Sequence, residues 1–269
     1  MKIVNRQVIY ATILGIGIYV FGFNFHTIIH EFGHAIAIWV QNGTMTGFYL
    51  HPFDMCYNTS TYVPNHILLY AGGGYLGLPI TLLFIILIWS IKSLRTPYAA
   101  PFIATCSIGF TQTGFHMLTD FTSKGVQSDY VFMVGLGFPL LIITLTGILY
   151  ILIGISIRIH FLPLFGVSYE MSIPQRLFIF ELGTLPYFLG IAIYRILYQN
   201  GNLLALVFIP IYPAILLAIE AILSKWLPNH ISFFKKIKFQ TVNSKHIIFS
   251  WLLGIIIIVI MFMVTIEKM

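Results

Sequence analysis

His30 and His34 stand four residues apart in the sequence His-Glu-Phe-Gly-His, inside an apolar stretch that runs from about residue 8 to residue 40. In a helix, the two imidazoles lie on one face, one turn apart, and can hold one zinc ion. Glu31, beside the first histidine, can then take a proton from water at that ion. The spacing therefore predicts a site for metal-assisted hydrolysis, with Glu31 as the general base.

The composition places this pentad in a membrane. Of the 269 residues, 58% are hydrophobic and only 8% are charged, and the mean hydropathy is +0.93. Soluble domains carry about 25% charged residues, so a soluble globular class is excluded. Ionisable side chains are costly in hydrocarbon, which makes an intramembrane His-Glu-His cluster a candidate functional site. Histidines that only bond to neighbouring helices are the alternative, but they explain neither the spacing nor the glutamate.

The apolar runs predict an all-α polytopic membrane protein with about seven transmembrane helices. A crossing needs about 20 apolar residues. The first run is too long for one straight crossing, because about 33 residues at 1.5 Å each give ~50 Å against ~30 Å of hydrocarbon. It is therefore strongly tilted, or broken near Gly22-Phe23-Asn24. The seven runs are roughly 8–40, 64–91, 98–119, 129–157, 176–199, 202–225 and 246–266.

Two segments near the pentad have patterns of their own. Residues 43–63 alternate and are rich in Thr, Tyr and Phe, which predicts a short β-ribbon at the membrane face. The second run contains Gly72-Gly73-Gly74 and Gly77, which predicts a close approach to another helix, and the pentad helix is the expected partner. Cys56 and Cys106 have no metal-knuckle or redox spacing, and we expect no disulfide between them.

The distribution of lysine and arginine predicts the orientation. With seven crossings and a cytoplasmic N-terminus, eleven cations lie inside and three lie outside, namely Lys124, Arg195 and Lys268. The protein is then a multi-pass protein of the cell membrane with its C-terminus outside. The net charge of +6 falls in short loops beside the lipid bilayer, so it does not indicate a nucleic-acid partner. The inner set is Lys2, Arg6, Lys92, Arg95, Arg158, Arg176, Lys225, Lys235, Lys236, Lys238 and Lys245.

A catalytic zinc usually has three protein ligands and one open position, so a third ligand is needed. The chain has only three aspartates, Asp54, Asp120 and Asp129, and all three are candidates. Asp129 opens the fourth run and would have a rigid helical mounting, although an N-cap role alone would also explain it. Asp120 closes the third run, one turn after His116. His116 itself could stabilise an oxyanion or simply bond to a neighbouring helix.

Several of these motifs together resemble the site-2 protease group of intramembrane zinc metallopeptidases, in particular its compact M50B-like branch. The matching features are His-Glu-Phe-Gly-His-Ala, then Asn42-Gly43, then the run Leu69–Gly77 that reads LYAGGGYLG, then Ser128-Asp129 before an apolar run. The resemblance covers about residues 20–155. One departure is the stretch 114–120, which reads GFHMLTD and lacks the Leu-Asp-Gly motif of well-known members.

The resemblance implies one zinc ion per chain, with His30, His34 and Asp129 as ligands and Glu31 as the base. It implies a metallopeptidase core at residues 1–158, with additional transmembrane helices of unknown role at 159–269. The expected function is therefore hydrolysis of a peptide bond in or near the transmembrane segment of a membrane-protein substrate. The alternatives are a divalent-metal-binding transporter and a non-proteolytic membrane scaffold.

Overall fold

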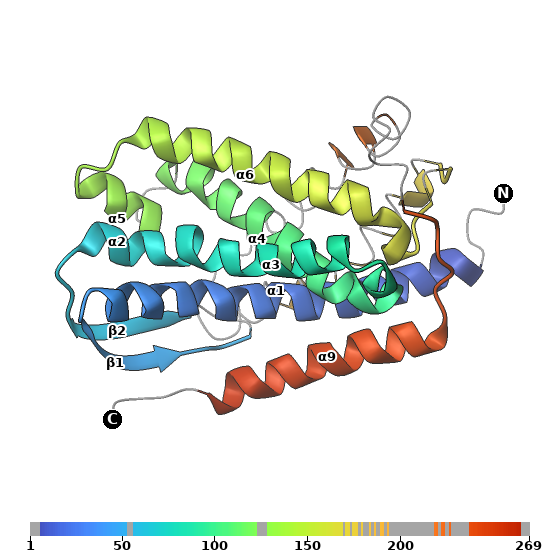
Figure 1. The fold of residues 1–269 in the computed structure, drawn as a ribbon, viewed down its shortest axis with the longest axis horizontal. Coiled ribbons are helices and arrows are strands. Elements are labelled where there is room, and N and C mark those ends of the chain that lie inside the picture. The colour runs from blue at the N-terminus through green and yellow to red at the C-terminus, as the bar shows by residue number, and fades with distance from the viewer. Residues whose placement is uncertain are drawn as a thin grey trace.

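The computed structural model describes residues 6–52, 56–122, 128–168, 170–172, 174–176 and 237–264, together with single positions between 179 and 226. Helices dominate this part of the chain, with one two-stranded antiparallel sheet (Figure 1). Within it, four helical segments are long and apolar enough to cross a bilayer, which indicates a multi-pass membrane protein. They are Arg6–Val40, His66–Ile88, Leu140–Phe165 and Ser244–Met263.

The first helix, α1 (Arg6–Val40), is continuous over 35 residues, or ~52 Å. The break considered near Gly22-Phe23-Asn24 is therefore wrong. The Asn24 side chain donates to the Val20 carbonyl 2.7 Å away, within its own helix, so it does not interrupt the helix. Gly22 instead allows close packing, because a Cβ atom there would lie 3.1 Å from the Thr105 backbone nitrogen of another helix.

The glycine run packs against the pentad helix, as its sequence predicts. Helix α2 (His66–Ala71) continues through a π-helical turn, η1 (Gly72–Leu76), into α3 (Gly77–Ser90). A Cβ atom on Gly72 would lie 2.6 Å from the carbonyl oxygen of Gly33, and one on Gly33 would overlap the carbonyl of Gly72. The two backbones can therefore touch only because both positions lack side chains.

The predicted ribbon is present as a hairpin beside the C-terminal half of α1 (Figure 1). Its strands are β1 (Thr44–Tyr49) and β2 (Tyr57–Tyr62), with Phe48 opposite Asn58. The chain leaves α1 through Asn42, whose φ of 56° lies in the left-handed region that asparagine tolerates. This reversal folds the hairpin back along the helix that carries the pentad.

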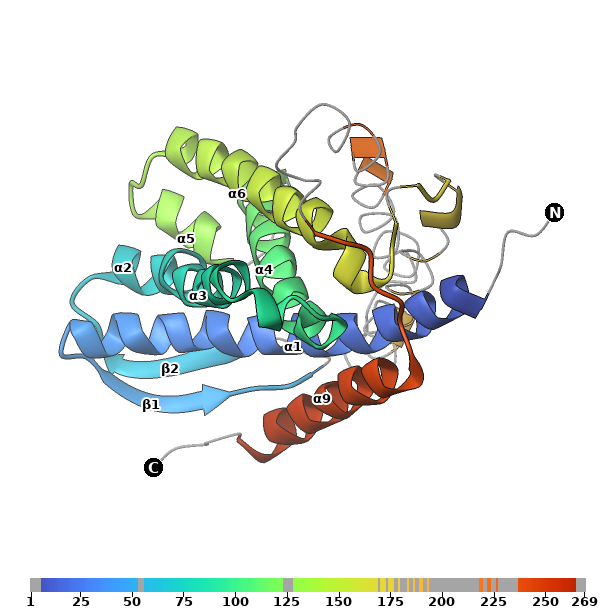
Figure 2. The ribbon, with the colours of Figure 1, turned by 45° about the vertical axis from the view of Figure 1, so that its right-hand side comes forward.

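Helix α4 (Ala100–Thr119) forms within the third predicted run and lies between α1 and α6 (Leu140–Phe161), as Figure 2 shows. Most of its residues are buried. It is not among the four candidate spans, since its five hydroxyl side chains, together with Gln112 and His116, lower its hydropathy. The hydroxyl of Ser107 donates to the Gly154 carbonyl at 2.8 Å, which ties α4 to α6.

The fourth predicted run, 129–157, is not one helix. The structure divides it into α5 (Asp129–Gly135) and α6. Gly137 has a φ of +91°, and Pro139 lacks the N–H that a continuing helix would need. The expectation of one continuous helix from residue 129 is therefore wrong: the candidate span begins only at Leu140, and Asp129 lies on a short helix of its own.

The last helix, α9 (Ser244–Met263), corresponds to the predicted run 246–266 and packs along α1 (Figure 1). The Trp251 indole donates to the Ile13 carbonyl at 3.0 Å, and a Cβ atom on Gly17 would lie 2.9 Å from the Ser250 hydroxyl oxygen. The predicted runs 176–199 and 202–225 lie almost entirely outside the described residues.

Arg158 departs from its expected place in an inner loop. It belongs to α6, is 7% exposed, and donates to the Ser107 hydroxyl at 3.2 Å and to the Tyr19 hydroxyl. The cation therefore joins three helices inside the fold and does not lie in a loop. Cys56 and Cys106 are not joined by a disulfide.

Candidate metal centre

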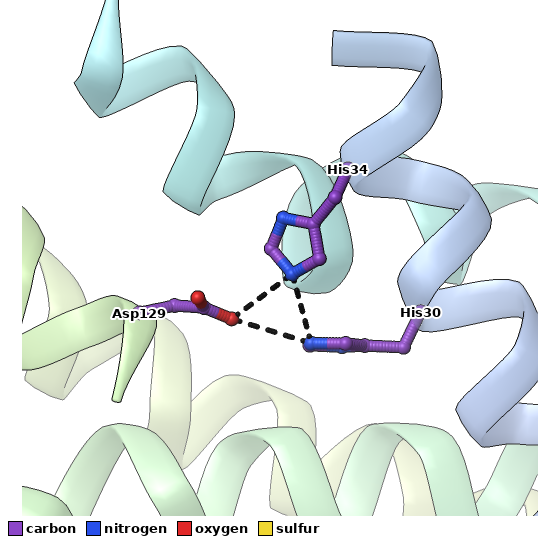
Figure 3. Close-up of side chains that lie close together, drawn as sticks. All are labelled: His30, His34 and Asp129. Atoms are coloured by element: carbon purple, nitrogen blue, oxygen red, sulfur yellow. Dashed lines mark hydrogen bonds and ion pairs between the residues drawn. The ribbon is translucent and has the colours of Figure 1, made fainter. Parts of the chain in front are cut away.

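His30, His34 and Asp129 converge on one point (Figure 3). The Nε2 atoms of the two histidines are 3.2 Å apart, and each lies 3.2 Å from Oδ2 of Asp129. Ligand atoms about 2.0–2.2 Å from a tetrahedral zinc are separated by ~3.3 Å, so the three atoms fit a zinc ion. The predicted ligand set is thus brought together, by two elements that are far apart in the sequence.

The ring of His34 is oriented by the helix next to it. Its Nδ1 lies 2.8 Å from the carbonyl oxygen of Leu69 in α2. A carbonyl can only accept, so Nδ1 carries a proton, and the Nε2 atom that faces Asp129 and His30 can offer its lone pair to a metal ion when the imidazole is neutral. A backbone carbonyl on the outer nitrogen is a common arrangement for histidines that bind metals.

The ring of His30 depends on the glycine run. A Cβ atom on Gly73 would overlap the His30 imidazole. The π-helical turn places this glycine directly against the ring, so the space for His30 exists because the residue has no side chain. The glycine run therefore shapes the site as well as the contact between helices.

Asp129 is the first residue of α5, and its carboxylate does not cap the helix. The Ser128 side chain has that role, since its hydroxyl accepts from the Val131 backbone N–H at 3.4 Å. The N-cap explanation for Asp129 is therefore wrong, and its carboxylate is available to the histidines.

Glu31 is 6% exposed and lines the same cavity as the three converging residues. The Asn58 side-chain amide donates to Glu31 Oε2 at 2.8 Å and to the Glu31 backbone oxygen at 3.0 Å. The sequence analysis missed Asn58. The alternation of residues 43–63 predicts a ribbon, but it does not indicate which ribbon residue meets the pentad.

The cavity has a volume of about 390 Å³ and lies between α1, α4, α5 and the hairpin. The competing aspartate, Asp120, also lines it, but Asp120 Oδ1 pairs with His116 Nδ1 at 3.1 Å and does not join the three converging residues. Asp54 lies outside the described residues. The complete lining is His26, Thr27, His30, Glu31, His34, Cys56, Asn58, Leu69, Tyr70, Gln112, Thr113, His116, Asp120, Ser128, Asp129, Tyr130 and Phe132.

Several polar atoms of this lining are buried and have no hydrogen-bond partner in the described part of the chain. They include His26 Nδ1, Gln112 Oε1, Asp120 Oδ2 and the Tyr130 hydroxyl. Buried polar atoms are normally satisfied, so this concentration indicates a cavity that holds water or a polar ligand. His26 was also missed from the sequence, although it stands one helical turn before His30 and so shares its face.

No protein-family model matches this chain, and neither a curated protein nor a solved structure shows significant similarity to it.

Proposed function

We propose that the protein is an intramembrane zinc endopeptidase of the site-2 protease type, which cleaves a membrane-protein substrate in or near its transmembrane segment. The observation that carries this proposal is the convergence of His30, His34 and Asp129, with all ligand atoms within 4.8 Å of one another. Glu31 lines the same cavity, next to the first histidine. Two imidazoles, one carboxylate and an adjacent carboxylate base are the components that zinc-assisted hydrolysis needs.

The residues divide the chemistry as follows. His30, His34 and Asp129 hold the ion, which when bound polarises the scissile carbonyl and makes water more acidic. Glu31 takes one proton from the attacking water as the water oxygen bonds to the carbonyl carbon. Glu31 then returns that proton to the amide nitrogen as the carbon–nitrogen bond breaks, so the products are a carboxylic acid and an amine. The base is thereby restored for another cycle.

The substrate must present an extended segment, because helical carbonyls are engaged in hydrogen bonds within the helix. The hairpin supports this part of the proposal, since β2 contacts the pentad helix through Asn58. An extended segment that adds to the hairpin as a further strand would satisfy its backbone groups and lie beside the cavity.

Metal analysis of detergent-purified protein tests the site. Wild type should hold about one zinc ion per chain, and His30→Ala should lose it, because two ligands bind zinc far more weakly than three. Glu31→Gln should keep the ion, since Glu31 is not a ligand. Retention of zinc by His30→Ala would contradict the ligand assignment.

Cleavage is tested by expressing wild type and Glu31→Gln in the same cells and sequencing the new protein termini in the membrane fraction. Wild type should produce termini in or beside transmembrane segments that Glu31→Gln does not produce. If both proteins hold zinc and yield the same termini, the metal serves transport or a scaffold and not proteolysis.

A further inference from the structure

Asn58 of β2 contacts the pentad through one side of its amide group. Its Nδ2 donates both to Glu31 Oε2 and to the Glu31 backbone oxygen. Both partners are acceptors, so the nitrogen must face Glu31 and Oδ1 must face the other way. The orientation of this amide is therefore fixed by its partners.

The other side of the amide is the feature that points to a ligand. Asn58 lines the cavity, and its Oδ1 is buried without a hydrogen-bond partner among the described residues. A buried carbonyl oxygen without a donor is unfavourable, so a ligand with an N–H at this point would gain from pairing with it. Asn58 thus offers an unpartnered acceptor that is mounted on a strand and lies next to the proposed base.

We infer that Asn58 is a positioning residue with two contacts: it fixes the Glu31 carboxylate through Nδ2 and accepts a backbone N–H of the extended substrate segment through Oδ1. This inference rests on the proposed function. One side chain then sets the base and the substrate backbone relative to each other. An N–H is free only where the segment has left its helix, so Asn58 selects an unwound segment. Proline has no N–H, so it is disfavoured at the substrate position that meets Asn58.

The contact with Glu31 can be tested without any substrate. Asn58→Asp keeps the shape of the side chain but places an oxygen against the Glu31 carboxylate, and should lower the melting temperature of the zinc-loaded protein. Adding Glu31→Gln supplies an amide donor to the new carboxylate and should recover most of that loss. Equal losses with Glu31 and with Gln at position 31 would show that the two side chains do not interact.

The contact with the substrate is tested with zinc-binding tetrapeptide hydroxamates. One peptide is unmethylated, and each of the others is N-methylated at a single backbone position. Wild type should lose about tenfold in affinity at one position, the size of one hydrogen bond. Asn58→Ala should lose less than about twofold at that same position. Similar penalties in both proteins at every position would overturn the inference.

One control variant and two distinct outcomes separate the possible failures. Thr59→Ala changes the next residue of β2, which is exposed and does not line the cavity, and it should keep the wild-type methylation pattern. If wild type holds no zinc and binds no hydroxamate, the proposed function fails. If the hydroxamates bind, but N-methylation lowers their affinity for Asn58→Ala as much as for wild type, only the proposed role of Asn58 fails.

Discussion

Two walls of the cavity each join imidazole to carboxylate, but they do so differently. On one wall, His30 and His34 of α1 meet Asp129 of α5, 99 residues after His30. On the other, His116 of α4 pairs with Asp120, the residue that directly follows the helix, at i and i+4. A pair at this spacing can form on any helix, whereas a three-residue cluster across distant elements requires the fold to place it. Only the first wall provides three converging ligand atoms among the described residues.

The two aspartates give the sharpest test of this difference, and the largest expected effect. Asp129→Ala should lower zinc affinity by more than about a hundredfold. Loss of a residue that only hydrogen-bonds to a metal ligand costs at most about that much, and Asp129 is a proposed ligand itself. Asp120→Ala should change it by less than about tenfold, because Asp120 contacts His116 and no proposed ligand. Competition with a coloured chelator measures both affinities. If Asp120→Ala lowers zinc affinity more than Asp129→Ala does, Asp120 and not Asp129 is the third ligand.

Gly73→Ala should have an intermediate effect on the first wall. The added methyl group overlaps the His30 ring, so the ring must turn away from its partners. We expect a loss of about ten- to a hundredfold in zinc affinity, which is the usual effect of removing a residue that orients a metal ligand. Gly135→Ala is the matched control, since nothing lies within 4 Å of a Cβ atom there. Equal affinities of Gly73→Ala and Gly135→Ala for zinc would contradict the role of the glycine run in shaping the site.

Ser128→Ala should have the smallest effect. It removes the N-cap of α5 at a cost of about 1 kcal/mol, which loosens the mounting of Asp129 and lowers zinc affinity by no more than about fivefold. Asn243→Ala removes the N-cap of α9, which contributes no proposed ligand, and should leave the affinity unchanged. The same titration compares the two, and equal effects would mean that α5 does not depend on its cap to hold Asp129.

The sequence predicted what local patterns determine. The pentad, the ribbon and the glycine run each depend on spacing within a short segment, and the structure contains a helix, a hairpin and a close helix contact at these places. The prediction of Asp129 as a partner of the histidines also agrees with the geometry. It had only two competitors, Asp54 and Asp120, because aspartate is rare in the chain.

The errors arose where tertiary contacts or a single turn decide the structure. Asn58 reaches Glu31 only because the hairpin lies along α1, which no local pattern indicates. Arg158 was assigned to a loop, although Ser107 and Tyr19 supply partners that allow it to be buried. The length of the apolar run 129–157 predicts one helix, but Gly137 and Pro139 lie where one helix ends and the next begins.

The division between α5 and α6 has a consequence for the stability of the whole chain. Because Asp129 lies on a separate short helix, an ion held with His30 and His34 would close a loop of 99 residues. A cross-link that closes a loop of about 100 residues removes ~4.7 kcal/mol of chain entropy from the unfolded state in the simplest treatment. The two cysteines of this chain, Cys56 and Cys106, form no disulfide. The ion would therefore restrain the chain as a disulfide does in other proteins, and its removal would lower the melting temperature as well as the activity.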